Sequence, residues 1–108
     1  PFFTNDQAAE VLEENLKILE AEADLLKALA HPIRLAIVKG LMNEEGCNVS
    51  KMQHCLEIPQ STLSQHLAKL READILSSKR NGLERNYYVV DEQAKKIVEV
   101  LSQLKIDT

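Results

Sequence analysis

A polar segment over residues 59–70 carries one narrow apolar stripe, and it constrains the fold more than any other part of the chain. Leu63, Leu67 and Leu70 recur at i, i+4 and i+7, the spacing of one buried face of a helix. The other positions hold amides, hydroxyls and an imidazole where a solvated helix would carry Glu and Lys: Gln60, Ser61, Thr62, Ser64, Gln65 and His66. Such groups donate and accept hydrogen bonds, as reading base edges in a major groove requires. The segment therefore predicts a DNA-reading helix; the alternative is a surface helix that happens to lack charge.

A short helix is expected just before this segment. Ser50 followed by Gln53 is a capping-box signal for a helix that begins near Ser50. Residues 57–59 then form a tight connection into the polar helix. Two helices joined by so short a turn, the second polar on its outer face, predict a helix-turn-helix over residues 50–74.

Downstream of this pair the apolar period changes to that of strands. Residues 75–80 and 83–90 flank Asn81-Gly82, which favours a two-residue hairpin turn. Three cations lie at or near the tip: Lys79, Arg80 and Arg85. The hairpin over residues 75–90 is therefore expected to be a wing that follows the phosphate backbone or enters the minor groove. The alternative is a solvated hairpin whose Lys and Arg side chains protect its edge.

The charge of the chain is unevenly distributed along the sequence. The formal net charge is −4, which taken alone argues against nucleic-acid binding. Residues 1–47 hold nine acidic and four basic side chains, whereas residues 48–90 hold six basic and four acidic ones. Because exposed charges are screened beyond about 8 Å at physiological salt, the local excess decides contact with phosphates. Lys69, near the end of the polar helix, adds a further cation that can hold the backbone.

Helices are also expected at both ends of the chain. Residues 6–21 predict a helix with a heptad-like stripe, followed by a short helix over Leu25–Ala30 and a third that begins at Pro32. A last helix is expected over residues 91–105. The apolar positions of the two terminal helices are candidates for pairing two copies of the chain: Leu12, Leu16, Leu19, Val98, Leu101 and Leu104.

These elements predict one domain over residues 1–108, mainly α-helical with a small β-hairpin wing. Its parts are a dimerisation helix over 1–23, the helix-turn-helix over 50–74, the wing over 75–90 and a second dimerisation helix over 91–106.

Four stretches of the chain carry a resemblance to a known family. They are residues 29–41, residues 59–67 with their Gln-Ser-Thr-x-Ser-x-His-Leu string, residues 70–73 and residues 80–88. In this order they resemble the ArsR/SmtB family of bacterial repressors, over roughly residues 24–104. The resemblance implies a winged helix-turn-helix homodimer, paired through its first and last helices, that represses transcription until an inducer weakens DNA binding. Within the family the sequence is most similar to the subgroup without a metal site, which includes sulfide-responsive repressors.

The wing departs from the family pattern. Four residues separate Gly82 from Tyr87, where relatives usually have three before a Tyr-Tyr pair. The phase of the second strand is therefore open, and so is whether Glu84 or Arg85 points at DNA.

Metal ligands of the family are missing. Asn48 and Ser50 stand where metal-sensing relatives have a Cys-Val-Cys pair, and the last helix has no His for the family's second site. His31, His54 and His66 lie on three separate elements, although His54 with Cys47 and Cys55 leaves a weak soft-ion alternative. We expect no metal and no cofactor.

Cys47 and Cys55 are candidates for redox control or for ordinary structural roles. Their alpha carbons are expected near or beyond the limit of about 7 Å for a disulfide. Sulfide-responsive relatives pair a cysteine of this region with one in the last helix, and here the last helix has none.

The expected function is that of a dimeric, sequence-specific repressor without metal that binds a palindromic operator in double-stranded DNA. Thiol oxidation or sulfur species at Cys47 and Cys55 are its candidate inducers. The alternatives are a regulator without any small inducer and a winged-helix protein-interaction module. An enzyme is not expected, because the sequence has no nucleophile–base pair, phosphate loop or evident carboxylate pair. Two cysteines and no apolar run long enough for a membrane span predict a protein of the reducing cytoplasm. The family resemblance implies that it is bacterial and nucleoid-associated.

Overall fold

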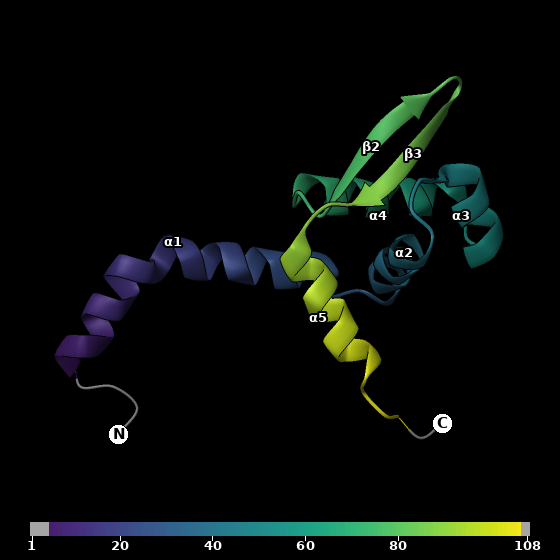
Figure 1. Ribbon diagram of the computed structural model, residues 1–108. Helices are drawn as coiled ribbons and strands as arrows, with labels where there is room; N and C mark the ends of the chain where they lie inside the picture. The colour runs from purple at the N-terminus through teal and green to yellow at the C-terminus, as the bar shows by residue number, and fades with distance from the viewer. Residues whose placement is uncertain (1–4, 107–108) are drawn as a thin grey trace.

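The computed structural model describes residues 5–106, with side chains described from residue 9 onward. Within this range the chain forms five helices and a three-stranded antiparallel sheet with the strand order β1-β3-β2, and the β2–β3 hairpin projects from the helical body (Figure 1). Their bounds are α1 Asn5–Leu29, α2 Pro32–Asn43, β1 Cys47–Asn48, α3 Val49–Leu56, α4 Gln60–Glu72, β2 Leu76–Asn81, β3 Glu84–Val89 and α5 Glu92–Ser102. The predicted class, mainly helical with a small β wing, is confirmed. The outermost parts of the predicted domain, residues 1–4 and 107–108, lie outside the described residues.

The core is aliphatic and lies between α2, α4, α5 and the base of the sheet. Leu63 and Leu70 are fully buried and Leu67 is 2% exposed, which confirms the apolar stripe of residues 59–70. Burial of a leucine side chain contributes about 1.5–3 kcal/mol, so these three fix which side of α4 faces inward. The opposite side of α4 is thereby directed to solvent.

Helix α1 is one uninterrupted helix, so the predicted division into helices over 6–21 and Leu25–Ala30 is wrong. No Gly or Pro lies between Asn5 and Leu29, and this stretch is rich in Ala, Leu and Glu, which favour helix. Leu29 is 3% exposed and, with Leu25 and Ala28 packed against the core, anchors the C-terminal end of the helix, while its N-terminal part extends away from the body (Figure 1). Among the described helices, none has the length and apolar character needed to cross a membrane.

Helix α3 is capped by Asn48 and not by Ser50, which corrects the predicted capping box. The Asn48 side-chain oxygen accepts a hydrogen bond from the backbone N–H of Lys51 at 2.8 Å, and Asn48 has extended backbone angles. Asn is as good an N-cap as Ser, and it comes first in the chain. The helix therefore begins at Val49.

The wing (β2 and β3) turns one position later than predicted. Asn81 pairs with Glu84, so the central turn residues are Gly82 and Leu83. Gly82 has a φ of +66°, whereas Leu83 is not among the residues with positive φ. Positive φ at the first central residue alone is typical of a type II′ turn, in which Gly occupies that position. The short strand β1, which pairs with β3, was not predicted because two residues leave no alternating pattern.

Helix α5 ends at Ser102, before the predicted end at Lys105. Asp91 caps its beginning by accepting a hydrogen bond from the Gln93 backbone N–H at 3.3 Å. Ala94 and Val98 are buried in the core, at 0% and 1% exposure.

The turn between α3 and α4 offers a test of backbone strain. Glu57 ends α3 with a φ of 55°, in the left-handed region. Because that region costs a residue with a β-carbon about 1–2 kcal/mol, Glu57→Gly should raise the free energy of unfolding by about 1 kcal/mol. Urea denaturation measures the change. The matched variant Glu99→Gly, at an exposed position inside α5, should lower the same quantity by about 1 kcal/mol, and a loss of stability in both would contradict the strain.

Candidate nucleic-acid interface

Helix α4 presents most of the predicted reading residues to solvent. Five of them are exposed: Gln60, Ser61, Ser64, Gln65 and Lys69. Thr62 is half-buried at the edge of the exposed face. The helix thus has a continuous face of uncharged hydrogen-bonding groups that begins at its N-terminus and reaches a cation near its end.

The N-terminus of α4 is open to an anion. Pro59 occupies the N-cap position and provides no side-chain hydrogen bond, and the first turn holds no acidic residue. The first backbone N–H groups of a helix have no partner within the helix and carry partial positive charge. Such a terminus favours phosphate.

His66 is turned inward, unlike the other predicted reading residues. Its ring centroid lies 4.3 Å from that of His31, and its Nδ1 lies 3.2 Å from Nη1 of Arg34. Its pKa is lowered, first by burial and then by the neighbouring His31, Arg34 and Lys69. The expected base contact by His66 is therefore not supported by its position. The sequence carried a signal for this, because Leu63, His66 and Leu70 fall at i, i+3 and i+7, on the edge of the apolar stripe.

Arg34 was not predicted as a site residue. Its Nε donates to the Ala28 carbonyl oxygen at 2.6 Å, in addition to the contact with His66. The residues around Arg34 in the sequence carry no signal of this, because its partners lie on α1 and α4 while Arg34 lies on α2.

Two of the three cations of the wing, Arg80 and Arg85, lie on one face of the hairpin. Arg80 and Arg85 are directly opposite in the β2–β3 register, so their side chains leave the same side of the sheet. Both are exposed, and Arg85 Nη1 donates to Ser78 Oγ at 2.9 Å. Like charges at opposed positions repel each other by about 0.2–1 kcal/mol, a cost that a bound anion would remove.

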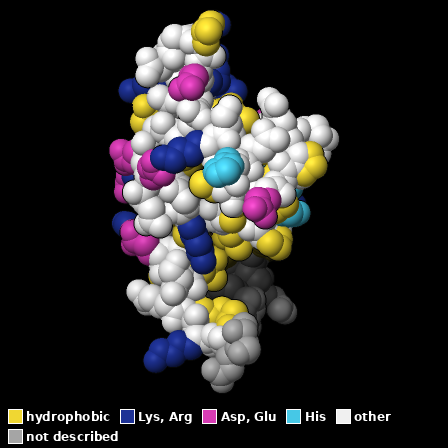
Figure 2. All heavy atoms as spheres, turned by 90° about the vertical axis from the view of Figure 1, so that its right-hand side faces the viewer, with side chains coloured by type: hydrophobic (Ala, Val, Ile, Leu, Met, Phe, Trp, Pro, Cys, Tyr) yellow, Lys and Arg dark blue, Asp and Glu magenta, His cyan; other side chains and the backbone are white. Residues whose placement is uncertain are grey.

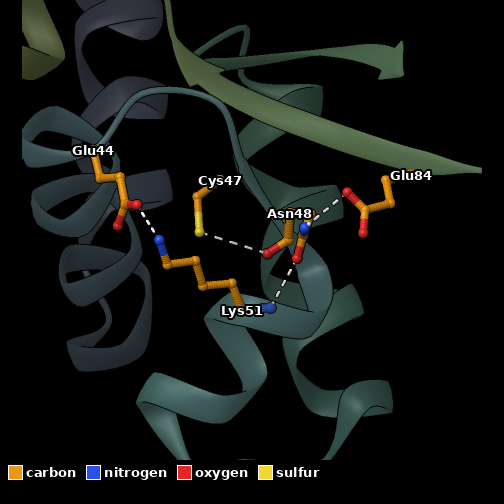
Figure 3. Close-up of polar contacts among 5 residues, drawn as sticks. All are labelled: Glu44, Cys47, Asn48, Lys51 and Glu84. Atoms are coloured by element: carbon orange, nitrogen blue, oxygen red, sulfur yellow. Dashed lines mark hydrogen bonds and ion pairs between the residues drawn. The ribbon is translucent and has the colours of Figure 1, made fainter. Parts of the chain in front are cut away.

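The opposite face of the wing holds Glu84, which settles the phase left open by the sequence. Asn48 Nδ2 donates to a carboxylate oxygen of Glu84 at 3.1 Å, so the acid is tied to the cap of α3 (Figure 3). Lys79, on the same face, places Nζ 5.5 Å from the Tyr88 ring centroid. Arg85 and Glu84 therefore point to opposite sides of the wing, and Arg85 lies on the same side as Arg80.

A space-filling view shows the surface at this end of the molecule. Lys and Arg side chains lie around the top, where the wing projects, together with acidic and apolar side chains, and further apolar side chains are exposed lower down (Figure 2).

The two cysteines share a cavity of about 100 Å³ between α2 and α3. Cys47 is half-buried and Cys55 is exposed, and both are free thiols. The pKa of Cys47 is raised, because burial disfavours its thiolate and the nearby Glu44 carboxylate repels it, while Lys51 acts weakly in the opposite direction. Glu44 and Lys51 form an ion pair beside this thiol (Figure 3).

Residues that could hold a metal do not converge in the described part of the chain. No group of three or more His, Cys, Asp and Glu side chains with suitable placement occurs there.

The predicted pairing residues fall into two groups. Five are exposed by 40% or more and have no partner in the described structure of one chain: Leu12, Leu16, Leu19, Leu101 and Leu104. Val98, at 1% exposure, packs inside the chain and is not available to a second copy.

Comparisons with known proteins agree with this geometry. A family model described as a helix-turn-helix domain matches residues 29–78. The transcriptional repressor PagR of Bacillus anthracis is 40% identical over 87 residues, which are 81% of this chain and 87% of that protein. Its crystal structure has a TM-score of 0.74 at 41% identity, covering 80% of this chain and 98% of that one.

Two further proteins are similar to this chain in sequence or in structure. The HTH-type transcriptional repressor SmtB of Mycobacterium tuberculosis H37Rv is 39% identical over 76% of this chain, which spans only 60% of that protein. The structure of reduced HlyU from Vibrio cholerae has a TM-score of 0.79 at 32% identity, covering 89% of this chain and 100% of that one. Two of these relatives, PagR and SmtB, are named as transcriptional repressors.

Proposed function

The chain belongs to the ArsR/SmtB family of helix-turn-helix repressors, and from this premise we propose that it acts as a dimer that reads a palindromic operator. One observation carries the proposal. The exposed face of α4 holds uncharged hydrogen-bonding side chains, while the wing beside it places Arg80 and Arg85 on one face. The first arrangement suits base edges and the second suits phosphates.

The residues of α4 have separate roles in this proposal. Ser64 and Gln65 contact base edges, while Gln60, Ser61 and Thr62 near the open N-terminus contact bases or nearby phosphates. Lys69 holds the backbone, together with the wing cations Lys79, Arg80 and Arg85. His66 supports α4 from its inner side and does not read bases, because its Nδ1 faces Arg34.

Selection from a random library of duplex DNA tests the function whatever the sequence of the operator. We expect enrichment of one inverted repeat, whose half-sites are about 34–36 Å apart or a multiple of that distance. Failure to enrich any sequence from a folded protein would overturn the proposal, and enrichment of a single unrepeated half-site would overturn its dimeric part.

Removing a cation of the wing should weaken binding to all DNA sequences by similar factors. Because Arg80 neutralises phosphate and does not read bases in this proposal, Arg80→Ala should lower affinity for selected and scrambled duplexes by similar factors. The slope of log affinity against log salt should become shallower by about 1. Fluorescence anisotropy at several salt concentrations measures both. Lys96→Ala, at an exposed position on α5, is the control that should leave the slope unchanged, and a loss confined to the selected duplex would contradict the role given to Arg80.

Cys47 and Cys55 are proposed as the point at which oxidation releases DNA. Both thiols line one cavity, and Cys47 directly precedes Asn48, the cap of α3. A disulfide between them would displace α3, which packs against α4. Diamide can form the bond by accepting the two electrons and two protons that the thiols lose.

The effect of diamide should depend on pH. Burial and Glu44 raise the pKa of Cys47, so the reactive thiolate becomes more abundant, and oxidation faster, as pH rises above neutrality. Anisotropy should show tight binding by the reduced protein, weaker binding after oxidation and no change for Cys55→Ser. If mass spectrometry shows complete disulfide formation and DNA binding is nevertheless unchanged, release of DNA by oxidation is contradicted.

A further inference from the structure

One half-buried guanidinium, that of Arg34, connects three helices. Arg34, on α2, donates from Nε to the Ala28 carbonyl oxygen at 2.6 Å and from Nη2 to the Lys27 carbonyl oxygen at 3.3 Å. Both carbonyls belong to the last turn of α1, where helix carbonyls lack partners and favour a cation. The remaining contact, from Nη1, is to His66 Nδ1 on α4 at 3.2 Å.

This geometry fixes the protonation of His66. An arginine side chain has only donors, so Nδ1 of His66 must be an acceptor and the neutral ring must carry its proton on Nε2. A proton on Nδ1 would remove the hydrogen bond and place two cations in contact. The titratable and charged groups that face His66 are Arg34 and His31 at α2 and Lys69 on α4, and the backbone of α1 lies behind Arg34.

The environment keeps His66 neutral near pH 7. The pKa of His66 is lowered from the ordinary 6.5, chiefly by burial. The neighbouring His31, Arg34 and Lys69 lower it further, because each disfavours a positive charge on the His66 ring. The contact with Arg34 is therefore present at neutral pH and is lost as pH falls through the acidic range below that value.

We propose that Arg34 and His66 form a positioning link that sets the orientation of α4 relative to α1, and that protonation of His66 breaks it. The inference rests on the proposed function, in which α1 pairs two copies and α4 reads DNA. In a dimer the two reading helices must enter major grooves at a fixed separation. An altered angle between α1 and α4 misplaces both helices at once, while the cations of the wing still hold phosphate.

The DNA-binding test measures specificity and not affinity alone. The quantity is the ratio of affinities for a selected duplex and its scrambled counterpart, at about pH 7.5 and about pH 5.0, on either side of the ordinary histidine pKa. We expect the ratio of the wild type to fall by about tenfold at acidic pH, within the usual range of coupling between sites. Affinity for the scrambled duplex should not fall.

Substitutions separate the link from a direct base contact. His66→Gln keeps an acceptor for Arg34 without titrating, so it should retain the neutral-pH ratio and lose the pH dependence. Arg34→Lys keeps the charge but cannot reach three acceptors with a planar fork, so its ratio should be low already at neutral pH and should not fall further at acidic pH. The matched controls are His54→Gln on α3 and Lys39→Arg on α2, both exposed, which should behave as the wild type.

Nuclear magnetic resonance tests the link in the free protein. The backbone amides of Ala28 and Leu29 on α1 should titrate with the pKa of the His66 ring in the wild type and should cease to follow it in Arg34→Lys. If the chemical shifts of these α1 amides do not change with the titration of His66 in the wild type, the link is overturned, whatever the DNA-binding results. A pH-independent ratio in the wild type, or loss of the ratio in His66→Gln at neutral pH, would also overturn it. Failure to select any duplex would instead count against the proposed function.

Discussion

Replacing Ser64 and Gln65 together with alanine is expected to remove sequence-specific binding while leaving the fold and nonspecific binding intact. Both side chains are exposed on α4, and alanine is a better helix former than either, so the helix itself is not weakened. Each good base contact contributes about 1–3 kcal/mol to discrimination, so the pair should account for a loss of about 100-fold or more in the ratio of specific to nonspecific affinity. Anisotropy titrations with selected and scrambled duplexes at one salt concentration measure this ratio.

The chain contains a matched control for this double substitution. Ser102 and Gln103, at the end of α5, are the same two residue types in the same order and are also exposed. Ser102→Ala with Gln103→Ala should leave the ratio unchanged. An undiminished ratio in the α4 variant would refute the assignment of Ser64 and Gln65 as readers, even if DNA binding persists.

The exposed face of α4 could be predicted because its signals are local. The period of the leucines and the absence of charge between them both lie within residues 59–70, and the burial of Leu63 and Leu70 follows directly. The class of fold followed from the same kind of local signal.

The inner side of the helix could be predicted only in part. The spacing of His66 relative to the leucines placed it at the edge of the buried face, but its partners could not be read from the sequence. Arg34 lies 32 residues away and also contacts the end of α1. Contacts of this kind depend on how three helices pack, which the periodicity of one segment does not specify.

Small backbone features escaped prediction for a different reason. The turn of the wing shifted by one residue because Gly82, and not Asn81, occupies the position with positive φ. The cap of α3 moved to Asn48 because two acceptable caps lie close together and the structure uses the first. In both cases neighbouring residues competed for one role, and tertiary contacts such as that between Asn48 and Glu84 favoured one of them.

Replacing Leu16 and Leu19 together with glutamate is expected to separate the dimer and to weaken operator binding severely. Both leucines lie on the exposed stripe of α1, at 48% and 42% exposure, and contribute nothing to the core of one chain. The fold should therefore survive, whereas burying two carboxylates in an apolar interface is unfavourable. A monomer binds one half-site at a time and loses the gain from joining two, which is about 100- to 10,000-fold.

Sedimentation velocity and anisotropy together decide whether α1 pairs the two copies. Lys17→Glu changes the net charge by the same amount as the two leucine substitutions, and it lies on the opposite side of α1. It should leave both the dimer and operator binding intact, because the pairing depends on the apolar stripe and not on the charge of the helix. A dimer that persists in the leucine variant would place the interface elsewhere. A wild-type protein that sediments as a monomer at micromolar concentration would remove the dimer from the proposed function, since two reading helices then have no fixed separation.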